Sequence, residues 1–247
     1  MTTTSDTPVP DAAALLAMLD RRLEPDGRAW YEAAVAAVRA DPTAVRARFP
    51  AVGRELGRRP LAPDADPQDL HIWWVEDAGR AGLLLALGPA VEAELADLYR
   101  FGDAAERRGI LRALPYLDLA DHGVGLVEDA LRTNDLRLIA AALGPAADHL
   151  DDHAFAQAVL KAVFVGLPLH GVSGLDRRVT PDLSRMLAGY VHERIAAGRD
   201  VPAEVWPLID RHPPADELAA ITAELDHPVA DRRDAARAAL RQRAVRT

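Results

Sequence analysis

The chain has 247 residues, 49% of them hydrophobic, which is enough apolar material to bury a large core in one domain or two packed lobes. Its formal charge of -9 at pH 7 argues against nucleic acid as a partner, because a polyanion is bound by a net excess of basic groups. The absence of cysteine excludes disulfides, thiolate nucleophiles and cysteine-ligated metals.

Two stretches of the sequence are informative about where in the cell the protein is located. Residues 1–10 are short and polar, without the basic start and apolar run of a secretory signal, so we expect a disordered tail there. The most apolar run, residues 81–87, is far shorter than the roughly 20 residues that a membrane-spanning helix needs. We therefore predict a cytoplasmic protein without membrane insertion, for which peripheral association with membrane enzymes stays open.

Apolar residues recur three and four apart in almost every segment, whereas strand-like alternation is nearly absent, so the chain is predicted to be all-α. N-terminal helices are expected within residues 11–56, with Pro50 kinking or splitting one of them. Residues 57–67 contain three prolines and read as a loop, and residues 68–247 form the main helical body. We expect one continuous domain overall.

The first helices after the loop have clear ends. A helix is predicted over residues 72–87, where Gly88 and Pro89 follow it. Gly102 ends the next helix, and Asp103 caps the one after.

Further along the chain, acidic and amide side chains mark helix starts. Asn134 or Asp135 is expected to cap a helix that runs to about Ala147, and Asp151 or Asp152 to cap the following one. A threonine, a proline and an aspartate at 180–182 then predict another helix start.

Similar sequence patterns recur along the chain. Those at 102–114 and 134–143 begin about 32 residues apart, within the range of paired-helix repeats, and residues 225–240 resemble a HEAT-type repeat. This spacing favours an irregular, HEAT-like α-solenoid of short paired helices. The alternative is a compact multi-helix bundle, because the spacing breaks down after Asp151.

Lys161 is the only lysine, and it lies in the apolar run 154–165, while the other 28 of the 29 basic residues are arginines. An ammonium group there must extend to water or find a partner, since burying it unpaired is costly. A structural ion pair from a neighbouring helix, a ligand carboxylate or phosphate, and a Schiff base are all compatible with this position.

Three further groups of polar residues have a possible chemical role. The cluster 148–153 contains two histidines and three aspartates, for which helix capping is favoured over metal ligation because the histidines straddle a helix start. Arg177 and Arg178 follow a glycine-rich segment and either cross-brace helices or hold a phosphate or carboxylate. Glu224 and His227 have one Glu-x-x-His spacing, whereas a diiron bundle needs two, so we predict no metal.

Five segments of the middle third, residues 131–135, 141–145, 149–153, 157–161 and 174–178, carry a specific likeness to a known family, which extends more loosely to Trp73 and residues 192–194. In these segments the chain resembles the EboA family of bacterial proteins. This resemblance implies a component of a gene cluster that also encodes a prenyltransferase of the UbiA type and that makes or exports a secondary metabolite precursor. It supplies no catalytic residues.

We therefore expect a non-enzymatic or auxiliary component that binds a small anionic or prenylated metabolite, or partner enzymes of the pathway, through a helical-repeat surface. The alternative is an enzyme acting by acid-base chemistry on a cyclitol-like, phosphorylated or prenylated intermediate, with Lys161 and the nearby histidine and aspartate side chains of residues 148–153. No cofactor is expected. The candidate ligand-binding residues are Lys161, Asn134, Asp152, His153, Arg177, Arg178 and Glu193.

Overall fold

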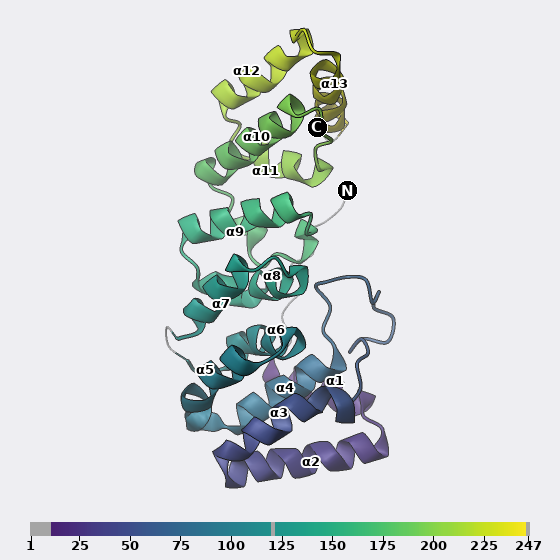
Figure 1. Ribbon diagram of the computed structural model, residues 1–247, viewed down its shortest axis with the longest axis vertical. Coiled ribbons are helices and arrows are strands. Elements are labelled where there is room, and N and C mark those ends of the chain that lie inside the picture. The colour runs from purple at the N-terminus through teal and green to yellow at the C-terminus, as the bar shows by residue number, and fades with distance from the viewer. Residues whose placement is uncertain (1–10, 120–121, 246–247) are drawn as a thin grey trace. The chain divides into compact units, whose positions relative to one another are not determined.

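The computed structural model describes residues 11–119 and 122–245, so the predicted tail over 1–10 lies outside the described residues. These residues form thirteen α-helices and several short 3-10 helices, with no β-strand among them, which confirms the all-α prediction (Figure 1). No helix in this part of the chain is both long and apolar enough to cross a membrane. The chain divides into two compact units, Met1–His149 with His170–Ser173 and Leu150–Leu169 with Gly174–Thr247.

The first unit contains eight of the helices. They are α1 (Ala12–Arg22), α2 (Pro25–Ala40), α3 (Val45–Glu55), α4 (Val75–Ala86), α5 (Val91–Phe101), α6 (Ala104–Ala113), α7 (His122–Arg132) and α8 (Leu136–Ala142). Asp103 accepts a hydrogen bond of 2.9 Å from the Glu106 amide and so caps α6 as predicted. Within this unit α6 packs against both α4 and α8, and Figure 1 shows it between them.

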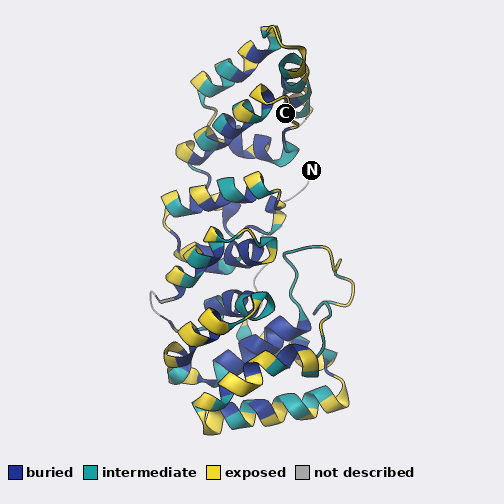
Figure 2. Ribbon diagram, viewed as in Figure 1, coloured by how far each residue is buried: buried dark blue, intermediate teal, exposed yellow. Residues whose placement is uncertain are grey.

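Helix α4 forms the centre of the first unit. Every residue from Val75 to Leu84 is buried, and the helix packs against α1, α2, α3 and α6 (Figure 2). The close packing depends on glycine: a Cβ atom at Gly82 would lie 1.8 Å from the Tyr31 hydroxyl oxygen, and one at Gly109 would lie 2.9 Å from the Arg80 side chain. Burial raises the pKa of Tyr31 to about 12.

One predicted helix split and one predicted helix start before α5 were wrong. Helix α3 continues through Pro50, so Pro50 does not split it, because its buried face, which includes Phe49 and Val52, stays packed while Pro50 faces solvent. Helix α4 begins at Val75 and not at residue 72, because the preceding chain is extended and pairs with the segment around Pro60. There the Leu61 amide donates to the Trp73 carbonyl at 2.8 Å.

Helix α8 is also shorter than predicted. Asp135 caps it by accepting from the Arg137 amide, but the helix ends at Ala142 and not near Ala147. Gly144 and Pro145 follow, and the chain continues as the 3-10 helix Pro145–His149. The missing amide donor of proline explains the early end.

The second unit contains the remaining five helices. They are α9 (Asp152–Val165), α10 (Pro181–Ala196), α11 (Trp206–Ile209), α12 (Ala215–Ala223) and α13 (Ala230–Ala244). Thr180 caps α10 with Pro181 at its first position, as predicted. Buried Ser184 donates to the Leu208 carbonyl at 2.7 Å, which joins α10 to α11, and Trp206 is completely buried beside it.

Candidate functional site

Helix α9 carries Lys161 and lies within the second unit, where it packs against α10. Asp151 caps its first turn by accepting 2.7 Å from the Ala154 amide, and Gly166 ends it in the left-handed conformation at φ 77°. The capping role predicted for Asp151 or Asp152 therefore belongs to Asp151. The cap fixes the helix start, and so fixes which side chains face solvent.

One side of α9 remains open to solvent. His153, Gln157 and Phe164 are exposed along it, and Lys161 is half-buried one turn before Phe164. Phe164 keeps 74% of its surface accessible, although its neighbours Ala162 and Val163 are buried. The open side of α9 therefore combines a cation, an amide, an imidazole and an apolar ring.

Arg178 braces the start of α9. Its guanidinium lies 4.2 Å above the Phe155 ring, donates to the Leu150 carbonyl at 2.6 Å and pairs with Asp152 at 3.0 Å. Asp152 is largely exposed, whereas Phe155 is fully buried. Among the predicted candidates, these contacts bring Asp152 and Arg178 together, and they do so in a helix brace.

The other predicted candidates occupy separate places. Asn134 is exposed in the turn between α7 and α8 of the first unit, beside the capping Asp135. Arg177 is exposed in the 3-10 helix Leu175–Arg177, and Glu193 is exposed on α10. His153 lies on the open side of α9, as described above.

The densest charged cluster is in the first unit, and it was not predicted from the sequence. Glu76, Asp77 and Arg80 of α4 and Arg108 and Arg112 of α6 are all buried. Arg108 donates to Glu76 at 2.8 Å and to Asp77 at 3.0 Å. Arg112 reaches Asp77 at 2.9 Å, and Arg80 reaches Glu76 at 3.2 Å. Each carboxylate thus faces two buried guanidinium groups, which join α4 to α6.

Arg112 also holds the long segment before α4. It donates to the backbone carbonyls of Leu70, at 2.9 Å, and Ile72, and its guanidinium lies 5.8 Å from the centre of the Trp73 ring. Burial lowers the pKa of Arg112, an effect that Asp77 opposes. The buried cluster therefore has a structural role, because its contacts fasten an irregular segment onto two helices.

A partly exposed pair of histidines lies at the edge of the first unit. The His71 and His170 rings meet edge to face at 4.8 Å, and His170 Nε2 lies 3.3 Å from both oxygens of Asp69. Burial alone would raise the pKa of Asp69, but hydrogen bonds from the His71 amide and the His170 ring hold it below its ordinary value. A Cβ atom at Gly171 would overlap the His71 ring, so the turn can approach it only because residue 171 is glycine.

Glu224, which has a Glu-x-x-His spacing to His227, forms its side-chain hydrogen bonds with other residues. It accepts hydrogen bonds from Arg232 and, at 3.0 Å, from His192, and these contacts lower its pKa to about 2, with Arg232 the main cause. Among the described residues no group of three or more acidic or histidine side chains converges as metal ligands would.

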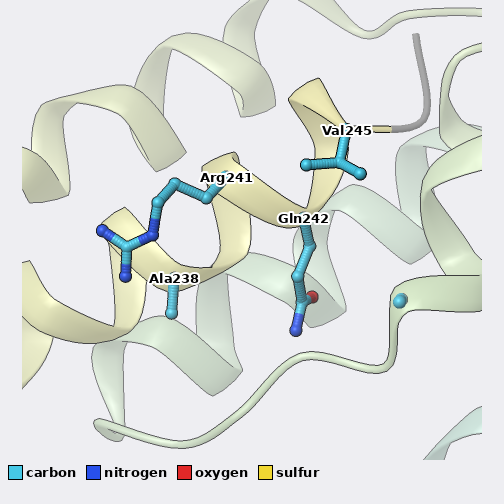
Figure 3. A pocket seen from close by; sticks show the side chains of 5 residues that line it. Ala238, Arg241, Gln242 and Val245 are labelled. Carbon is cyan, nitrogen blue, oxygen red and sulfur yellow. The ribbon is translucent and has the colours of Figure 1, made fainter.

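An open recess of about 450 Å³ lies beside the last turns of α13 (Figure 3). It is lined by Ala203, Ala238, Arg241, Gln242 and Val245. Figure 3 shows Ala238 and Gln242 pointing the same way, with Arg241 to one side and Val245 to the other. The side-chain oxygen of Gln242 is buried and accepts no hydrogen bond within the part of the chain that the structure describes.

Comparison with known proteins identifies a family. The family model described as "Metabolite traffic protein EboA" matches residues 12–210, which covers the first unit and the second as far as α11 and leaves α12 and α13 outside. No curated protein and no solved structure matches the chain. The resemblance seen in the middle third of the sequence is therefore confirmed over a longer stretch, and the chain belongs to the EboA family.

Proposed function

We propose that this chain is a non-catalytic binding component of metabolite traffic, and that the open side of α9 contacts a small anionic or prenylated metabolite. The supporting observation is the position of Phe164, exposed by 74%, one turn from half-buried Lys161. A cation beside an apolar ring suits a ligand with an anionic group and a hydrocarbon part. Helix α9 also lies within the stretch that matches the family model.

The charged groups elsewhere are consistent with a binding role. Arg178 and Asp152 stabilise the start of α9, and the buried cluster around Asp77 fastens α4 to α6. Such ion pairs organise a fold, and they leave binding to the exposed faces of its helices. Lys161 is the principal ligand contact in this proposal, and His153 lies about two turns earlier on the same side of α9.

The experiment is native mass spectrometry of the protein purified from the organism that encodes it, compared with the denatured mass. We expect a retained small molecule that is lost in Lys161→Ala and Phe164→Ser but kept in Arg199→Ala. Arg199 is an exposed cation of the same unit and serves as the matched control for charge. Equal retention in Lys161→Ala and Arg199→Ala would contradict the proposed site.

Helix packing within the first unit supports the proposed repeat architecture. Helix α6 contacts α4 and α8, its next-but-one neighbours, while α5 and α7 each contact the helix that follows them. This alternation is typical of paired-helix repeats such as HEAT, in which equivalent helices stack on one another. We therefore keep the irregular solenoid as the preferred architecture and the compact bundle as its alternative.

One observation favours the enzymatic alternative. In the Asp69 and His170 pair, a carboxylate orients an exposed imidazole, which is the arrangement of a general base. If His170 acts on the retained metabolite, His170→Asn will retain a molecule of different mass from that in the wild type. A binding component will retain the same molecule in both.

A further inference from the structure

We propose that the recess beside α13 binds a small amphiphilic anion that also carries a hydrogen-bond donor. Its hydrocarbon body would lie against Ala238 and Val245, its anionic group at Arg241 and its donor at Gln242. The site shares no residue with the open side of α9, and α13 lies outside the stretch matched by the family model. The proposed site on α9 and the proposed site beside α13 can therefore be tested independently of each other.

The size and lining of the recess suit a small ligand. Its volume of about 450 Å³ is within the range of small-molecule sites. Ala203 lines one wall, and Ala238 of α13 and Val245, the residue that caps the end of this helix, lie about two turns apart. Val245 exposes 87% of its surface, so a hydrocarbon group placed against it would remove apolar area from water.

Gln242 specifies a donor on the ligand. Its side-chain oxygen is buried without a hydrogen bond among the described residues, and a buried acceptor without a donor is unfavourable. Gln242 lines the recess, so a turn of its side chain would present this oxygen to a ligand hydroxyl or N–H group that supplies the donor. This requirement separates the proposed ligand from a plain hydrocarbon.

Arg241 specifies the anion. Five arginines against two aspartates give α13 a net charge of +3, in a chain whose formal charge is -9. Arg237 pairs with Asp234 at 3.1 Å and Arg243 with Asp210 at 2.7 Å. The exposed guanidinium of Arg241 makes no ion pair within the described residues, so it is the cation at the recess that an anion can reach.

The test uses the full chain and anilinonaphthalene sulfonate, a fluorescent probe with an aromatic body, an anionic sulfonate and one N–H donor. Fluorescence titration gives the Kd, and amide chemical shifts locate the bound probe. The variants are Arg241→Ala, Gln242→Leu and Ala238→Phe, which remove the cation, the acceptor and the space. Arg237→Ala is the matched control, because it removes an exposed arginine of the same helix that does not line the recess.

We expect saturable binding with shifts at Ala203 and along 238–245, weakened about tenfold or more by Arg241→Ala and unchanged by Arg237→Ala. Gln242→Leu should weaken binding while raising Tm, because it removes a buried acceptor that lacks a donor. Ala238→Phe should abolish binding. Failure of the probe to saturate, shifts confined to other residues, or equal weakening by Arg241→Ala and Arg237→Ala would each overturn the proposal. If Ala238→Phe does not fold, the comparison of probe binding between Arg241→Ala and Arg237→Ala tests the proposal.

Discussion

Arg112 on α6 pairs with Asp77 on α4 at 2.9 Å, and the two side chains are only 6% and 0% exposed. The same guanidinium donates to the carbonyl groups of Leu70 and Ile72. A single buried cation thus fixes both the packing of two helices and the path of the segment that precedes α4.

We predict that Asp77→Asn lowers the free energy of unfolding by about 3–5 kcal/mol, because Arg108 and Arg112 would then lie buried with one carboxylate fewer. Urea unfolding measures the change. Glu128→Gln breaks an exposed pair with Arg132 on α7 and should cost less than about 1 kcal/mol. Similar losses in both variants would show that the buried cluster does not stabilise this unit.

Gly82→Ala should destabilise the protein by about 1–3 kcal/mol, since the added Cβ would lie 1.8 Å from the Tyr31 hydroxyl oxygen. Tyr31→Phe removes that oxygen, so the double variant should recover part of the loss. Gly125→Ala on α7, where nothing lies within 4 Å of the new Cβ, is the matched control and should stabilise the helix. Purely additive losses at Gly82 and Tyr31 would contradict the packing described here.

Arg178→Ala should cost about 1–3 kcal/mol, because it removes the contact with the Phe155 ring and the hydrogen bond to the Leu150 carbonyl. Asp152→Asn should cost less than about 1 kcal/mol, since Asp152 is 72% exposed. Thermal unfolding compares the two. If Asp152→Asn proves as costly as Arg178→Ala, the ion pair and not the ring contact holds the start of α9.

Glu224 should make the second unit sensitive to acid. Its pKa in the folded chain is about 2, below the ordinary 4.5, so its contribution to stability is complete above pH 4.5 and is lost as pH falls toward 2. Glu224→Gln removes this dependence. We expect the Tm values of wild type and variant to differ most above pH 4.5 and to converge near pH 2; a constant difference across that range would contradict the assignment.

The local features of the fold were readable from the sequence, because helix caps depend on neighbouring residues. Asp103 and Thr180 begin helices as predicted, and the apolar spacing identified the helices themselves. The split predicted at Pro50 was wrong because burial of one side of α3 outweighs one lost hydrogen bond. Residues 72–74 were misjudged because a tertiary contact with the chain around Pro60 holds them extended.

The buried charged cluster was harder to foresee. Arg108 and Arg112 meet Asp77 across 31 and 35 residues of chain, a separation at which sequence spacing carries no information about contact. Arginine is also the common cation here, whereas Lys161 drew attention by being the only lysine. One signal was present: Glu76, Asp77 and Arg80 lie on the helix predicted over residues 72–87, directly before its apolar run 81–87, where charged side chains that are buried need partners, as at Lys161.

The most direct test of the proposed function is hydrogen–deuterium exchange of the wild-type chain with and without the small-molecule filtrate of lysate from the organism that encodes it. A metabolite on the open side of α9 should slow exchange in peptides that cover Asp152–Val165. The same filtrate should leave those peptides unchanged in Lys161→Ala. Slowed exchange confined to other helices, or no slowing in any peptide, would contradict the central claim that α9 presents the metabolite site.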